Sequence, residues 1–222
     1  MVIQGKKGLN EYKYLVMFDL ASHNTGVCLW DIENNIPLKT FSIVADKVDG
    51  IFVSNLYIQL DIFFNRLLDM GIKKEEVFVS KEAMPVQLRG GSSTVQTFIA
   101  MAKAHAILDL FLDQHDIDVY DYKGVYPATT HSYLKKLLGE DAKKTIDKKD
   151  IKEYVVKTYG IEVNNFDESD AAFLAVTLIE SKWNKDVQEK IKEVKRHKKE
   201  LKMKKAIQDC DDQIAELENL LR

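Results

Sequence analysis

The stretch Tyr14–Trp30, YLVMFDLASHNTGVCLW, decides the fold. Two short apolar runs flank a polar turn that contains a glycine, and this pattern predicts a β-hairpin. Residues 36–44 are a candidate third strand of the same sheet. Asp19 directly follows the first apolar run. Its carboxylate either caps the turn or is held by a partner such as a metal ion, because an unpaired charge in a sheet is costly.

Strands and helices alternate after this hairpin. Short apolar runs predict further strands over residues 77–80 and 117–122. Helical spacing of apolar residues, often ended by a glycine, predicts helices. They cover residues 53–70, 93–112, 129–138, 148–159 and 171–179. The order of these elements predicts an α/β fold with a mixed five-stranded sheet flanked by helices.

The C-terminal segment, residues 183–222, contains neither glycine nor proline and is free to be almost entirely helical. Its apolar residues follow two heptad frames that do not join in register between Leu201 and Ile207. The sequence leaves open whether a coiled-coil helix stutters there or breaks into a hairpin, and we prefer the hairpin. The chain is therefore divided into a main domain, residues 1–182, and a helical extension, residues 183–222.

Composition excludes several classes of protein. The chain has 222 residues and is 45% hydrophobic, which excludes wholesale disorder. Cys28 and Cys210 are too few and too far apart for a disulfide framework or a cysteine-based zinc cluster, which indicates a reducing, cytoplasmic setting. The chain lacks a run of about 18 uncharged apolar residues, so no membrane span is predicted.

The net charge of -3 at first argues against nucleic acid as a partner, but this sum hides two basic segments. Residues 143–152 contain five lysines against two aspartates, and residues 195–205 contain seven Lys or Arg against one glutamate. Either segment is a solvated surface or a contact for phosphates. The acidic total therefore does not exclude a DNA-binding protein.

Acidic residues follow or begin the apolar elements in a regular order. Asp19 and Glu82 follow strands, and Asp167 and Asp170 lie one helical turn apart at the start of a helix. Taken singly, Glu82 suits an ordinary surface position and Asp167 suits a helix cap. Together the four carboxylates would repel one another at one sheet edge unless divalent cations neutralise them. Oxygen ligands suit Mg²⁺ or Mn²⁺, and two such ions form a clamp for phosphodiester cleavage.

Several stretches resemble a known family. MFDLASHNTGVCLWD resembles the first hairpin of the ribonuclease-H-like superfamily, and SKEAMP resembles the second acidic position of its RuvC-like branch. VYPATTHSYLKKLLG, KKTIDKKDIKEYVVKTYGI and FDESDAAFLAV resemble its C-terminal half. The resemblance covers roughly residues 13–182, and it is best to the bacteriophage group of RuvC-like Holliday junction resolvases. Ala83 departs from the usual pattern, and residues 183–222 have no counterpart in the shorter bacterial enzymes.

The resemblance implies an endonuclease with a four-carboxylate, two-metal site. It also implies a homodimer whose two copies pack around the helix at residues 93–112. It implies that Asp19 bridges two Mg²⁺ or Mn²⁺ ions, that Glu82 and Asp167 flank them, and that Asp170 completes the site. The family cuts two strands of like polarity at a four-way DNA junction and leaves 5′-phosphate and 3′-hydroxyl ends. A phage origin would place the enzyme in the cytoplasm of the host bacterium.

Basic residues near the predicted acids are candidates for DNA contact. The resemblance places lysines of the segment 143–152 near the scissile phosphate, and we select Lys148, Lys149 and Lys152. Arg89 lies in a glycine-rich loop close to Glu82 and is a further candidate, although the paired glycines more simply mark a flexible turn.

Other functions compete with this hypothesis. The same chemistry also suits a nuclease with a broader choice of flaps and forks. A scaffold or DNA-binding protein with decayed catalysis is a second rival, against which the intact acid set argues. An ATPase of the actin and sugar-kinase type shares the first hairpin, but that fold usually needs a second, similar half, for which 222 residues leave no room.

Overall fold

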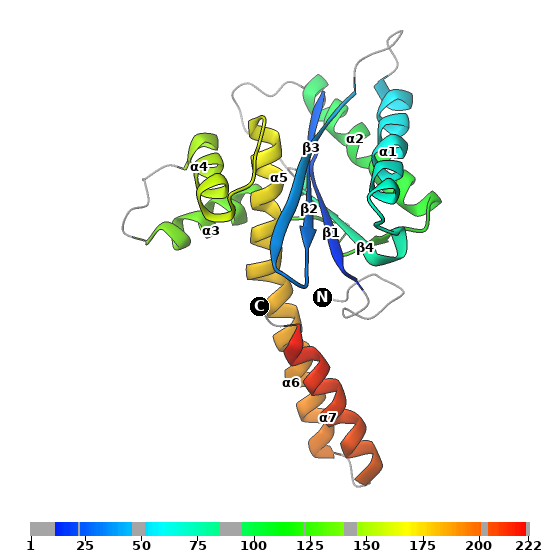
Figure 1. Ribbon diagram of the computed structural model, residues 1–222, viewed down its shortest axis with the longest axis vertical. Coiled ribbons are helices and arrows are strands. Elements are labelled where there is room, and N and C mark those ends of the chain that lie inside the picture. Colours follow the sequence, from blue (N-terminus) through cyan, green and yellow to red (C-terminus); the bar gives the residue numbers. More distant parts are fainter. Residues whose placement is uncertain are drawn as a thin grey trace.

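The computed structural model of the protein describes residues 12–21, 23–45, 52–84, 95–121, 123–139, 146–200 and 204–220. A five-stranded sheet forms its centre, in the order β3-β2-β1-β4-β5 (Figure 1). The strands are β1 (Tyr14–Asp19), β2 (Asn24–Asp31), β3 (Ile36–Val44), β4 (Val77–Lys81) and β5 (Asp118–Val119). β1 pairs antiparallel with β2 and parallel with β4, which confirms the predicted mixed sheet.

Helices cover both faces of the sheet (Figure 1). On one face lie α1 (Phe52–Asp69) and α2 (Val95–Gln114), and a short 3₁₀ turn η2 (Lys74–Glu76) leads into β4. On the other face lies α5 (Phe166–Thr177), with α3 (Pro127–Leu138) and α4 (Lys148–Tyr159) packed outside it. The predicted α/β layers are therefore present.

The central strand explains the two hydrophobic cores. In β1, Val16 and Phe18 pack with the core under α1 and α2, while Leu15 and Met17 pack with the core under α5. Successive side chains of a strand point to opposite faces, so a strand covered on both sides is apolar throughout. Asp19 continues the Leu15–Met17 side, and its carboxylate therefore emerges toward α5.

The C-terminal extension is a helical hairpin. α5 runs through a π-helical turn, η4 (Leu178–Trp183), into α6 (Asn184–Glu200), and the chain then returns as α7 (Lys204–Asn219) (Figure 1). Lys195 bonds Glu218 at 2.9 Å, and Lys198 forms an ion pair with Asp211. The preferred hairpin is thus confirmed over a single long helix.

The base of this hairpin is part of the main core. Val187, Ile191 and Leu220 are buried in the same cluster as the residues under α5. The boundary at residue 182 lies within continuous helix, since η4 leads directly into α6. The division of the chain into two domains remains a prediction.

One helix of the described part of the chain, α2, is long and apolar enough by length and composition to cross a membrane, and 33% of its most apolar window is buried. Core helices meet the same criteria. The buried residues Ala104, Leu108 and Phe111 pack α2 against the sheet. Asp109 pairs with Lys81 of β4. These contacts are those of a core helix, but Val95, Ile99 and Leu110 leave an apolar side exposed.

Candidate active site

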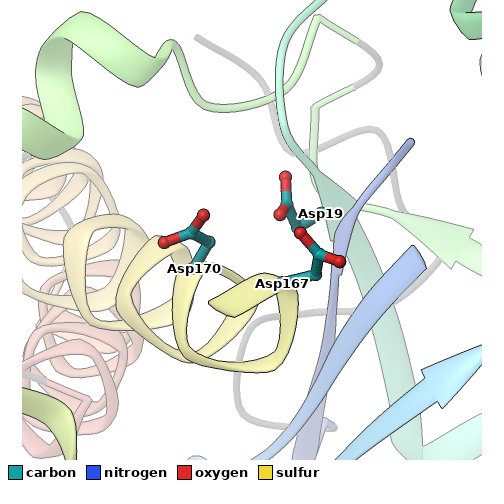
Figure 2. A group of neighbouring side chains, drawn as sticks. All are labelled: Asp19, Asp167 and Asp170. Atoms are coloured by element: carbon teal, nitrogen blue, oxygen red, sulfur yellow. The ribbon is translucent and has the colours of Figure 1, made fainter. Parts of the chain in front are cut away.

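The four predicted acidic residues meet at one edge of the sheet. Asp19 ends β1, and Glu82 follows β4, the parallel neighbour of β1. The backbone N–H of Glu82 donates to the carbonyl of Phe18 at 2.8 Å, which holds the two strand ends together. Asp167 and Asp170 lie in the first turns of α5 and point toward Asp19 (Figure 2). Residues about 150 positions apart in the chain thus form one cluster.

Two glycines permit this close approach. Gly26 lies opposite Asp19 in the β1–β2 register, and a Cβ atom there would lie 1.9 Å from the carbonyl oxygen of Asp167. Gly124 has a φ of +73°, and its Cβ would lie 2.4 Å from the carbonyl oxygen of Lys81. A larger residue in place of Gly26 would displace the backbone at the start of α5. A larger residue in place of Gly124 would displace the backbone at Lys81 and Glu82.

The start of α5 differs from the sequence prediction. The predicted helix began at residue 171, and Asp167 suited a helix cap, whereas α5 begins at Phe166 and its N-cap is Asn165. The Asn165 side chain accepts from the backbone N–H of Glu168 at 2.9 Å. Asp167 is therefore not needed as a cap, and its Oδ2 atom instead accepts from the Asn24 side chain at 2.6 Å.

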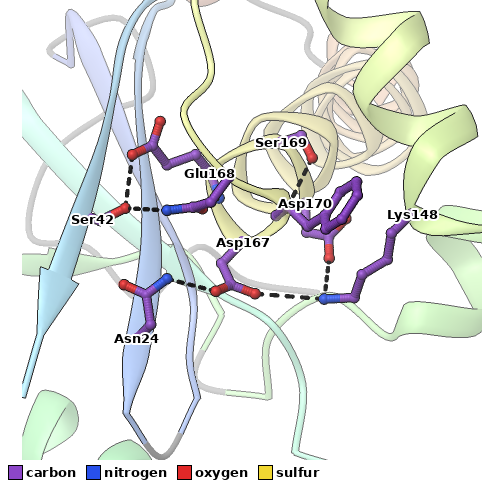
Figure 3. A network of polar contacts seen from close by, with 9 residues as sticks. Asn24, Ser42, Lys148, Asp167, Glu168, Ser169 and Asp170 are labelled. Atoms are coloured by element: carbon purple, nitrogen blue, oxygen red, sulfur yellow. Dashed lines mark hydrogen bonds and ion pairs between the residues drawn. The ribbon is translucent and has the colours of Figure 1, made fainter.

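Glu168 is a buried carboxylate that sequence reasoning did not single out. It is 2% exposed and accepts from the hydroxyl of Thr40 at 2.9 Å. It also accepts from the hydroxyl of Ser42 at 2.7 Å (Figure 3). Both the backbone and the side chain of Asn164 also donate to it. Burial raises the pKa of Glu168, but these hydrogen bonds outweigh burial, so its pKa is lowered overall. Glu168 therefore fastens the start of α5 to β3.

The position of Glu168 in the helix could have identified it as an acid outside the carboxylate cluster. Adjacent residues of a helix point about 100° apart, so Glu168 cannot share the face of Asp167 and Asp170 once the helix starts at residue 166. Serine and threonine on the adjacent strand β3 then provide its donors.

Burial and mutual repulsion dominate the electrostatics of the cluster. One carboxylate oxygen from each of Asp19, Asp167 and Asp170 lies within 4.8 Å of the others. Burial raises the pKa of Asp19 well above its usual range, and the charges of Glu82 and Asp170 raise it further. Burial also raises the pKa of Glu82 and of Asp170. A bound cation would therefore stabilise the ionised carboxylates of the cluster.

The donor set fits a divalent cation. Asp170 Oδ1 is buried and has no hydrogen-bond partner within the described part of the chain. An unpartnered buried carboxylate oxygen is costly, and a metal ion would satisfy it. The surrounding ligands are all carboxylate oxygens, which suit Mg²⁺ or Mn²⁺ rather than a soft metal.

A cavity of about 540 Å³ opens over these acids. All four line it, and so does Lys148. Its other walls combine polar residues of α3 with apolar side chains, including Thr130, His131, Ile146, Ile151 and Leu174. The cavity gives solvent and an extended substrate access to the carboxylates.

The predicted basic residues are distributed unevenly. Lys148 reaches the acids, with its Nζ atom 2.9 Å from Asp170 and 3.5 Å from Asp167 (Figure 3). Lys149 is exposed, and the Nζ of Lys152 lies 5.9 Å from the centroid of the Phe166 ring. Arg89 lies outside the described residues. The roles assigned to these residues in DNA contact remain predictions.

Solved structures of other proteins share the fold of this chain. No family model matches the sequence, and no curated protein matches it. Among solved structures, the RuvC of Thermus thermophilus in complex with a Holliday junction substrate matches with a TM-score of 0.51 and 12% identity. The match covers 74% of this chain and 91% of that chain. A second Thermus thermophilus RuvC structure matches with the same TM-score and identity and is covered to 92%. The chain therefore has a RuvC-like, ribonuclease-H-like fold, as its sequence predicts.

Proposed function

We propose that this RuvC-like fold carries a metal-dependent endonuclease that resolves four-way DNA junctions by paired nicks. The observation that carries the proposal is the convergence of Asp19, Glu82, Asp167 and Asp170 beneath an open cavity. A buried oxygen of Asp170 there has no hydrogen-bond partner among the described residues. A structural neighbour bound to a Holliday junction substrate supports the choice of DNA.

The proposed roles of the acids follow their positions. The four acids would together hold two Mg²⁺ or Mn²⁺ ions, with Asp19 as the shared ligand, Glu82 and Asp167 as flanking ligands and Asp170 completing the set. Two such ions would supply an activated water molecule and charge stabilisation for the leaving 3′-oxygen, which would give 5′-phosphate and 3′-hydroxyl ends. Gly26 permits the close approach of the acids, and Asn24 and Glu168 hold them in place through the contacts described above.

The start of α4 would contact DNA beside this site. Lys148, Lys149 and Lys152 fall within its first five residues, on one wall of the cavity or next to it. Phosphate contacts from such lysines would make binding sensitive to salt. Arg89 remains a further candidate.

A homodimer would present two sites to one junction. The exposed apolar side of α2, at Val95, Ile99 and Leu110, is the proposed interface. The bacteriophage group remains the proposed source of the chain, which would place its action in the cytoplasm of a host bacterium.

Cleavage of synthetic DNA tests the proposal. A four-way junction, a Y-fork and a linear duplex are incubated with the protein in Mg²⁺ or in chelator. Paired nicks in the junction alone, and only with Mg²⁺, are expected. Asp19→Asn and Glu82→Gln should each abolish cutting, whereas Asp69→Asn, which removes an exposed acid at the end of α1, should not.

The outcomes separate the rival functions. Equal cutting of the fork would replace junction resolution by a broader branched-DNA nuclease. Tight junction binding without cutting in Mg²⁺ or Mn²⁺ would identify a DNA-binding or scaffold protein. Full activity of both Asp19→Asn and Glu82→Gln would refute the active site itself.

A further inference from the structure

Lys148 has a fixed origin at the start of α4. Asp147 caps this helix, and its Oδ1 accepts from the backbone N–H groups of Lys149 at 2.8 Å and Asp150 at 3.1 Å. Asp150 returns the contact by accepting from the backbone N–H of Asp147 at 3.0 Å. This capping box fixes the backbone of Lys148, so only its side chain can move.

The ammonium group of Lys148 lies against two of the carboxylates that a metal ion would need. It lies 2.9 Å from Asp170 Oδ2 and 3.5 Å from Asp167 Oδ1. These two acids are also members of the three-carboxylate cluster that suits a metal ion. Mg²⁺ binds its oxygens at about 2.0–2.1 Å, and two cations held by the same carboxylates repel each other strongly.

The side chain of Lys148 is able to withdraw. It is 58% exposed, and it lines the open cavity rather than being enclosed by α5. Lysine is a compact point charge on a flexible stem, so it can leave the acids without disturbing α4.

We propose that Lys148 is a built-in counter-ion of the carboxylate cluster, which competes with divalent metal ions and lowers their affinity until its ammonium group swings away. The inference rests on the metal site of the proposed function. It assigns Lys148 a role toward the metal that is separate from DNA contact. Lys148 thereby holds the cluster together before metal binds and sets the metal concentration at which the site fills.

Calorimetric titration with Mn²⁺, using the full-length chain without DNA, tests this role. Lys148→Met should bind Mn²⁺ at least ~10-fold more tightly than the wild type, because it removes one positive charge from the binding oxygens. Lys148→Arg keeps the positive charge, so its Mn²⁺ affinity should stay within about threefold of the wild-type affinity. A threefold change is well under the 1.4 kcal/mol of a tenfold change. Lys157→Met removes an exposed charge nine residues further along α4 and serves as the matched control.

Thermal unfolding gives an independent measurement. Without metal, Lys148→Met should unfold at a lower temperature than the wild type, since its carboxylates lose their counter-ion. Saturating Mn²⁺ should remove this difference. Lys148→Gln provides a second uncharged variant if Lys148→Met does not fold.

The direction of the effect distinguishes this role from a structural one. If Lys148 only supports the fold, its loss should loosen the site and weaken Mn²⁺ binding. Equal or weaker binding by both uncharged variants, with normal binding by the wild type, would overturn the inference and leave the proposed function intact. A wild-type chain that binds no Mn²⁺ would overturn both.

Discussion

Gly26 offers a direct test of how the site is assembled. In Gly26→Ala, the new Cβ atom would start 1.9 Å from the carbonyl oxygen of Asp167, and real Cβ contacts essentially never fall below 3.0 Å. The obstructing atoms belong to backbone, so no side-chain rotation relieves the clash. The first turn of α5 must therefore move away from Asp19 by about 1 Å.

This displacement has a predictable size of effect. A misplacement of ~1 Å in a catalytic constellation costs about 100-fold in rate. Over-packing of this kind also costs ~1–3 kcal/mol of stability. We expect Gly26→Ala to cut a four-way junction about 100-fold more slowly at saturating Mg²⁺, and to unfold at a lower temperature.

Val27→Ala is the matched control. Val27 is buried in the same strand, but its side chain lies in the core under α1 and α2, away from the acids. Its truncation should also cost ~1–3 kcal/mol while leaving Asp167 in place. Single-turnover cleavage and thermal unfolding are measured for both variants at a temperature where both are folded. A wild-type rate in Gly26→Ala, or an equal loss in Val27→Ala, would refute the reasoning.

Three further predictions follow from the electrostatics and from the hairpin. Asp19→Asn should raise the unfolding temperature of the metal-free protein at pH 7.5, because ionising a buried carboxyl whose pKa is raised opposes folding. The same variant should abolish cleavage. A lower unfolding temperature would contradict this reasoning. Glu168→Gln should cost ~1–3 kcal/mol at neutral pH in denaturant unfolding. Because the pKa of Glu168 is lowered, its contribution is present above its unfolded pKa and is lost as pH falls through its folded pKa, so the wild type and Glu168→Gln should converge in acid. Removal of residues 183–222 should lower the unfolding temperature, because Val187 and Leu220 belong to the main core, but in sedimentation it should leave the dimer intact if α2 forms the interface.

Local patterns in the sequence were enough to predict most elements. The helix predicted over residues 148–159 has the bounds of α4, because Asp147 caps its start and Gly160 ends it in a left-handed conformation. The four acids were found because each lies at the end of an apolar element, and parallel pairing of β1 and β4 brings such ends together. Metal binding by these acids was argued from their chemistry, whereas the separate role of each acid was assigned only through resemblance.

Features that depend on tertiary contacts were missed. The apolar helix was predicted over residues 171–179, yet α5 starts at Phe166, where Asn165 caps it and Glu168 finds donors on β3. The contact of Lys148 with Asp167 and Asp170 joins α4 to α5 and has no local signature. The tight contact at Gly26 likewise exists only after α5 has docked on the hairpin.

The distance along the chain between Asp19 and Asp170 also sets an order of events during synthesis. The hairpin that contains Asp19 is made before α5, which follows all five strands along the chain. Contacts of such long range form late in folding. A nascent or prematurely terminated chain that lacks α5 therefore has no complete carboxylate cluster. The proposed nuclease site therefore cannot form before α5 has been made and has docked on the hairpin.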